Sequence, residues 1–222
     1  MKSLYYSFQT KVEHAYIITL KDNPISIQTS QRCQESCKNV DMPYIIWDAF
    51  DGTDNQTIKT PQQFENETFF KILKVNDNKL SISQISTLLS HISLWLECAR
   101  IDKPIVILEH DAIMLRKFEE MYSYNAIVYL GCQEWVKHGW RMCPIPPFGA
   151  GNENYRFILR AHAYAIDPPM AKNLLAHVLK YGIYETADFM VRADIFNITH
   201  QGIYAYDEPT ITTINNPEGN VI

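Results

Sequence analysis

Two carboxylates, Glu109 and Asp111, stand one residue apart directly after an apolar run. The run 105–108 reads Ile-Val-Ile-Leu and predicts a strand that is buried on both faces. Two carboxylates at a strand end suit a hard divalent cation, which prefers oxygen ligands. Such an ion would bridge the oxygens of a diphosphate and neutralise the charge that builds on this leaving group. The alternative is a pair of solvated loop carboxylates, and His110 between them is expected to point away.

Strands that alternate with helices are expected to position this pair. The predicted strands are 15–20, 44–47, 105–108, 126–130, 163–166 and 203–206, and the predicted helices are 27–39, 81–101 and 168–180, with shorter ones near 61–70 and 185–188. This alternation predicts an α/β fold with a mostly parallel central sheet flanked by helices. Ligands of such sheets bind beyond the carboxyl ends of the strands. That rule places Asp22, Asp51 and Glu109 along one rim.

Composition indicates one globular domain. The 222 residues are 46% hydrophobic, which is enough for a full core, so we expect a single domain over 1–222 with 1–13 and 216–222 as peripheral tails. The net charge of -5 argues against a nucleic-acid partner. No signal peptide or run of about 20 apolar residues is visible. The five cysteines indicate reduced thiols and an intracellular, cytoplasmic setting; Cys33 and Cys37 are expected to be half-buried thiols, with zinc binding as the alternative.

Several short motifs follow one another along the chain, and their order is informative. The motif Leu89-Ser90-His91 precedes Leu94-Trp95, and the predicted strand continues as Leu108-Glu109-His110-Asp111-Ala112. Further matching stretches are Tyr16-Ile17-Ile18-Thr19-Leu20, Ala49-Phe50-Asp51-Gly52, Ala163-Tyr164-Ala165-Ile166 and Ala187-Asp188. Together they cover about residues 15–211. In these motifs the chain resembles glycosyltransferase family 25, which includes bacterial lipopolysaccharide galactosyltransferases and the collagen galactosyltransferases.

The resemblance implies a fold and an activity. It implies a single GT-A-type nucleotide-sugar transferase domain that works in lipopolysaccharide or other glycan biosynthesis. A hexose such as galactose or glucose would move from a UDP-sugar to a hydroxyl of a glycan acceptor, with inversion and with help from Mn2+ or Mg2+. The expected partners are the nucleotide-sugar donor and the glycan or glycosylated acceptor. No nucleic acid or transmembrane segment is expected, and any peripheral membrane contact would come through the acceptor.

The resemblance also assigns roles to the residues of the rim. Asp111 is expected to bind the metal directly, and Glu109 would bind it through water or hold the ribose. Thr19, Asp22 and Asp51 lie on strand-end loops where the uridine would sit. The alternative for these three is turn formation, because Asp and Thr often cap such turns.

The remaining candidates concern the acceptor and the sugar. Asp188 is expected to be the base that takes the proton of the acceptor hydroxyl, with helix capping near Thr186 as the alternative. His91 is either a substrate contact or a hydrogen-bonded core histidine. Trp140 would stack on a sugar face or anchor a loop. Weaker candidates for stacking, phosphate binding or metal binding are Trp135, Tyr155, Arg141, Arg156, Arg160 and His200.

The chain departs from the family pattern at three positions. His110 replaces the middle acid of the Leu-Glu-Asp-Asp-Ala motif, Gln84 replaces a Glu, and Thr19 replaces the Asn of the first strand. One alternative is therefore a catalytically inactive or binding-only member of the same fold. A different nucleotide-using enzyme would need a Gly-rich phosphate loop, which the first strand lacks. A structural or interaction domain is the third alternative.

Overall fold

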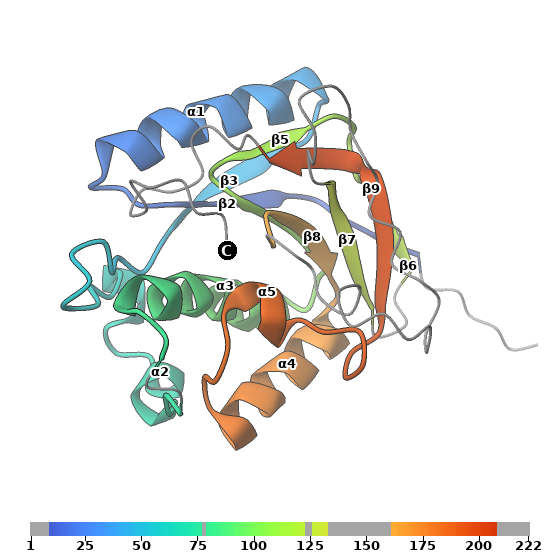
Figure 1. Ribbon diagram of the computed structural model, residues 1–222. Coiled ribbons are helices and arrows are strands. Elements are labelled where there is room, and N and C mark those ends of the chain that lie inside the picture. The colour runs from blue at the N-terminus through green and yellow to red at the C-terminus, as the bar shows by residue number, and fades with distance from the viewer. Residues whose placement is uncertain (1–8, 77–78, 123–125, 133–160, 208–222) are drawn as a thin grey trace, which may run out of the picture.

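The computed structural model describes residues 9–76, 79–122, 126–132 and 161–207. A central sheet lies between two layers of helices (Figure 1). Helix α1 covers one face, and α3, α4 and α5 cover the other. The bounds are α1 Pro24–Asn39, α2 Thr68–Ile72, α3 Ile82–Ile101, α4 Pro168–Tyr181 and α5 Ala187–Met190, with a 3-10 turn at Gln62–Phe64. The predicted α/β class is confirmed.

The sheet is mixed, whereas the sequence predicted a mostly parallel one. Its strand order is β3-β2-β4-β8-β7-β9-β5. Strand β2 pairs in parallel with β3 and β4, and β7 pairs in parallel with β9, but β8 and β5 run antiparallel to their neighbours. The bounds are β2 Ala15–Thr19, β3 Tyr44–Asp48, β4 Ile105–Glu109, β5 Ala112–Met114, β7 Ile127–Cys132, β8 Ala163–Ile166 and β9 Ile198–Asp207; β1 Gln9–Lys11 and β6 Glu120–Tyr122 form a separate antiparallel pair.

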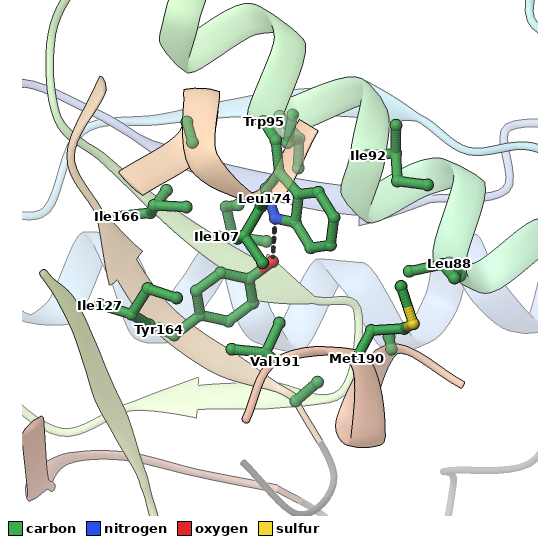
Figure 2. Packing of buried hydrophobic residues seen from close by; sticks show 14 of the residues in the cluster. Leu88, Ile92, Trp95, Ile107, Ile127, Tyr164, Ile166, Leu174, Met190 and Val191 are labelled. Carbon is green, nitrogen blue, oxygen red and sulfur yellow. Dashed lines mark hydrogen bonds between the residues drawn. The ribbon is translucent and has the colours of Figure 1, made fainter. Parts of the chain in front are cut away.

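Alternating side chains of the central strands fill two cores. In β4, Ile105 and Ile107 point to the helices α3 and α4, while Val106 and Leu108 point to α1. All four are buried, as the unbroken apolar run predicted. On the α3 side, Trp95 and Tyr164 meet at the centre of the cluster (Figure 2).

The α1 side holds the two cysteines of that helix. Cys33 and Cys37 are free thiols, and both are fully buried in the smaller core. The expected thiols are therefore present, but more deeply buried than predicted.

Side-chain caps set where the helices begin. Asn23 accepts hydrogen bonds from the backbone N–H groups of Ile25 and Ser26, so α1 begins earlier than the predicted residue 27. Ser81 is the N-cap of α3 and forms a capping box with Gln84. None of the described helices is both long enough and apolar enough to cross a membrane.

The last described strand begins earlier than the sequence predicted. Strand β9 begins at Ile198 and not at the predicted residue 203, because its polar first half pairs with β7 from the register Ile127↔Ile198 onward.

Strand β5 was not predicted, since its three residues carry no periodic signal.

Asp167 links α4 to the sheet and supplies a test of the fold. Its buried carboxylate accepts the backbone N–H of Met170, at 2.9 Å, and that of Ala126, at 3.1 Å. We expect Asp167→Asn to lower the free energy of unfolding by about 1–3 kcal/mol, because an amide cannot accept at both positions. Urea unfolding measures this, with the exposed Asp102→Asn as the matched control. Equal urea midpoints for the two variants would contradict the assignment.

Candidate functional site

The carboxyl ends of three parallel strands form one rim of the sheet. Thr19 ends β2 and pairs with Asp48 at the end of β3, and Ile18 pairs with Glu109 at the end of β4. The three ends therefore lie at the same level. The rim also carries an ion pair between Lys21 and Asp48, with Nζ and Oδ2 3.1 Å apart.

Glu109 lies where this rim meets the buried core. Its side chain is 25% exposed, and its Oε1 is 3.0 Å from Nε2 of the fully buried His91 of α3. On the other side of the ring, Nδ1 of His91 is 2.9 Å from the Tyr164 hydroxyl. That hydroxyl accepts the indole N–H of Trp95, also at 2.9 Å (Figure 2). A line of polar groups thus runs from the core to Glu109.

Asp188 belongs to the same neighbourhood. Burial lowers the pKa of His91 to about 4, and the negative charge of Asp188 partly opposes this shift. Asp188 is partly buried in the short helix α5, which packs against α3. The side chain of its N-cap residue Thr186 makes no capping hydrogen bond. Glu109 and His91 are therefore in direct contact, and Asp188 lies close enough for its charge to act on His91.

Asp111 has a different environment from Glu109. It is only 5% exposed. Burial and the neighbouring Cys37 raise the pKa of Cys33 in α1, and the charge of Asp111 adds to this shift. His91, the described neighbour of Glu109, lies on the α3 face of the sheet. Cys33, the described neighbour of Asp111, lies on the α1 face.

Of the two carboxylates, Glu109 is the one that a cation at the rim could reach. Among the described residues, no group of three or more His, Cys, Asp or Glu side chains could hold a metal ion. A Mg2+-type ion needs fewer protein ligands when substrate phosphates and water complete its shell, and one or two carboxylates then suffice. Glu109 is accessible from the rim, so this carboxylate is compatible with such an ion.

His110 points to α1, away from Glu109 but toward the same helix as Asp111. Its Nδ1 is 2.8 Å from the Ser26 hydroxyl, and the same oxygen accepts the backbone N–H of Leu20 at 3.0 Å. This contact ties the ends of β2 and β4 to the first turn of α1. Burial lowers the pKa of His110 to about 4, so the ring is neutral at pH 7.

The nucleotide candidates on the other strand ends differ in exposure. Thr19 is 3% exposed, and its hydroxyl donates to the Ile17 carbonyl at 3.3 Å. Asp22 is exposed in the turn before α1. The pKa of Asp51 is lowered overall. Burial alone would raise it, but the hydrogen bonds from Thr53 and the charge of Lys59 together outweigh burial. Asp51 thus organises its own turn, and the roles of all three toward a nucleotide stay predictions.

Gly52 explains why this turn can pack against α3. A Cβ atom at this position would lie 2.7 Å from the Ile82 carbonyl oxygen, inside van der Waals contact. Only glycine lets the loop after β3 approach the first turn of α3 this closely.

His162 is a buried residue of this region that the sequence analysis did not single out. Its carbonyl accepts the Glu109 N–H at 2.9 Å, and its ring packs edge-on against Tyr129. A side chain at Gly131 would overlap the ring. A glycine inside an apolar strand signals such a close approach, and that signal was available in the sequence.

Some side chains predicted to belong to the site are not described by the structure. Residues 133–160 are not among the described ones, so Trp140 and its weaker companions Trp135, Tyr155, Arg141, Arg156 and Arg160 stay predictions. His200 pairs with Tyr129 through the β9 backbone, and its role as a metal ligand also stays a prediction.

An α/β domain with carboxylates at the carboxyl ends of adjacent strands has the arrangement of a ligand-binding enzyme domain. Comparison with protein families identifies it further. Residues 12–142 match glycosyltransferase family 25 (LPS biosynthesis protein). The match covers more than half of the 222 residues, so the chain belongs to this family of glycosyltransferases. The matched region contains His91, Glu109 and Asp111 and ends before Asp188. No match was found among curated protein sequences.

The two neutral histidines predict a pH dependence of stability. His91 and His110 have folded-state pKa values of about 4, below the ordinary value of 6.5, so the unfolded chain binds protons first as the pH falls. Stability should therefore fall between pH 6.5 and pH 4, by about 2 kcal/mol for His91 down to pH 5 and by less for the partly exposed His110. Urea unfolding at pH 7, 6 and 5 measures this, and a constant midpoint would contradict the neutral burial of both rings.

Proposed function

We propose that this chain transfers a hexose, such as galactose or glucose, from a UDP-sugar to a hydroxyl of a glycan acceptor. The reaction inverts the anomeric centre and uses Mn2+ or Mg2+. Membership of glycosyltransferase family 25 supports the general activity. The observation that carries the proposal is Glu109, partly exposed at the end of β4 and held by His91, with Asp188 nearby.

The donor would bind over the rim formed by β2, β3 and β4. Glu109 and Asp111 would hold the divalent ion, which neutralises negative charge on the diphosphate when bound. Asp22 and Asp51, on the loops after β2 and β3, are the candidates for the uridine, together with Thr19. Asp22 is exposed and Thr19 is buried, so this assignment is better supported for Asp22.

The acceptor side would use Asp188 as the base. As the acceptor oxygen forms its bond to the anomeric carbon, the bond between that carbon and the diphosphate breaks. Asp188 takes the proton of the acceptor hydroxyl, and UDP leaves with the electron pair of the broken bond. Asp188 is partly buried, and its charge acts on His91, which supports this role.

An inactive, binding-only member of the family is the second candidate, because His110 and Gln84 replace acids of the family pattern. Both residues have structural contacts. Gln84 completes the capping box of α3, which needs no charge, and His110 ties β4 to α1. Neither substitution removes a contact of Glu109, so the active enzyme is the better supported candidate.

Calorimetric titration of UDP tests the donor assignment. We expect UDP binding that requires Mn2+, with a loss of about tenfold or more in Asp111→Ala, because the ion would lose a carboxylate. Binding without any metal would move the diphosphate site away from Glu109 and Asp111. No binding with or without Mn2+ would contradict the UDP-sugar assignment.

Replacing the proposed base tests the acceptor side. Asp188→Asn should lower the transfer rate about 100-fold or more while leaving Mn2+-dependent UDP affinity close to that of the wild type, because general base catalysis contributes at this level. Asp194→Asn is a matched control, since Asp194 lies six residues away and pairs with Arg192. Full turnover of Asp188→Asn would exclude this residue as the base.

A further inference from the structure

Four polar side chains form a single line that ends at Glu109. Trp95 and His91 lie four residues apart on α3 and therefore share one face of the helix. Tyr164 of β8 faces them, because it pairs with Ile107, two residues before Glu109. Trp95, His91 and Tyr164 are fully buried, and only Glu109 reaches solvent.

The donors and acceptors of this line fix the position of every proton in it. An indole N–H only donates, so the Tyr164 oxygen accepts from Trp95. A carboxylate only accepts, so Nε2 of His91 must carry the proton that meets Glu109. Nδ1 of the neutral ring is then an acceptor, and the single hydroxyl proton of Tyr164 donates to it. Burial raises the pKa of Tyr164, so this proton is retained.

The opposite direction of proton donation, with the His91 proton on Nδ1, is unfavourable at both ends of the line. A proton on Nδ1 would leave the Nε2 lone pair facing the carboxylate of Glu109 at 3.0 Å. The Tyr164 oxygen would face two donors, Trp95 and His91, and its own proton would lose its acceptor in this line. In a buried site such a mismatch is costly, because no bulk water compensates for it.

We propose that Tyr164, together with Glu109, fixes the tautomer and ring orientation of His91, and that His91 thereby holds Glu109 in the orientation that binds the metal and the diphosphate of the donor. The metal and donor part of this assignment rests on the proposed function. His91 is then a positioning residue and not a substrate contact, because its ring is fully buried behind Glu109.

Two conservative variants separate this role from simple loss of stability. Tyr164→Phe removes the hydroxyl that donates to Nδ1, so this buried nitrogen loses its partner and only Glu109 still holds the ring. Trp95→Phe also removes one buried hydrogen bond, but Tyr164 can still donate to His91. Mn2+-dependent UDP affinity should fall about tenfold or more in Tyr164→Phe, as for partners that orient metal ligands, and stay within about threefold of the wild type in Trp95→Phe.

A second pair of variants tests His91 itself. His91→Gln keeps an N–H donor for Glu109, whereas His91→Leu has none. We expect His91→Gln to retain part of the UDP affinity that His91→Leu loses. Unfolding curves for all four variants identify any that is too unstable to compare.

Nitrogen-15 NMR of the imidazole rings tests the proton positions without reference to activity. The wild type and Trp95→Phe should show His91 with a proton on Nε2 and a hydrogen-bonded Nδ1 without a proton, and Tyr164→Phe should shift the Nδ1 resonance because that nitrogen loses its donor. A wild-type proton on Nδ1 would overturn the proposal. So would equal UDP affinities in Tyr164→Phe and Trp95→Phe. If the wild type shows the expected tautomer but binds no UDP, this result contradicts the proposed function. The role of His91 toward the donor is then also contradicted.

Discussion

The hydrogen bond between His91 and Glu109 connects the hydrophobic core to the rim where the ligand is expected. Its two residues come from α3 and β4, so the bond exists only if the helix packs correctly on the sheet. Trp95 and Tyr164 are central members of the larger core and also members of the hydrogen-bonded line. The same burial that stabilises the fold therefore removes water from His91 and strengthens its bond to the carboxylate. Stability and the orientation of Glu109 are consequences of one packing arrangement.

The opposite face of the sheet serves the rim in another way. Helix α1 is held at its first turn by the Asn23 cap and by the contact of Ser26 with His110 and Leu20. This arrangement fixes the loop after β2 next to the end of β4, where the nucleotide is expected to bind. The family's middle acid is thus replaced by a residue whose ring joins two elements, and Glu109 keeps its own partner on the other face.

The sequence predicted elements more reliably than the contacts between them. The unbroken apolar run before Glu109 is a local signal, and the strand that it predicts is confirmed. An apolar run looks alike in parallel and antiparallel strands, so the reversed direction of β8 was not predictable. His91 and Glu109 were both candidates, but their pairing depends on packing between residues 18 positions apart. The buried neighbourhood of Asp111 depends on how the chain turns after β4, and no spacing rule describes that turn.

UDP release from UDP-hexoses, compared between the wild type and Glu109→Gln, tests the central claim most directly. The substitution keeps the size of the side chain but removes the charge at the rim. If Glu109 holds the metal and the diphosphate, the wild type releases UDP in the presence of Mn2+, and Glu109→Gln should lose about 100-fold or more of this rate while remaining folded. Equal rates for the two proteins would contradict the claim that the chemistry takes place at the end of β4.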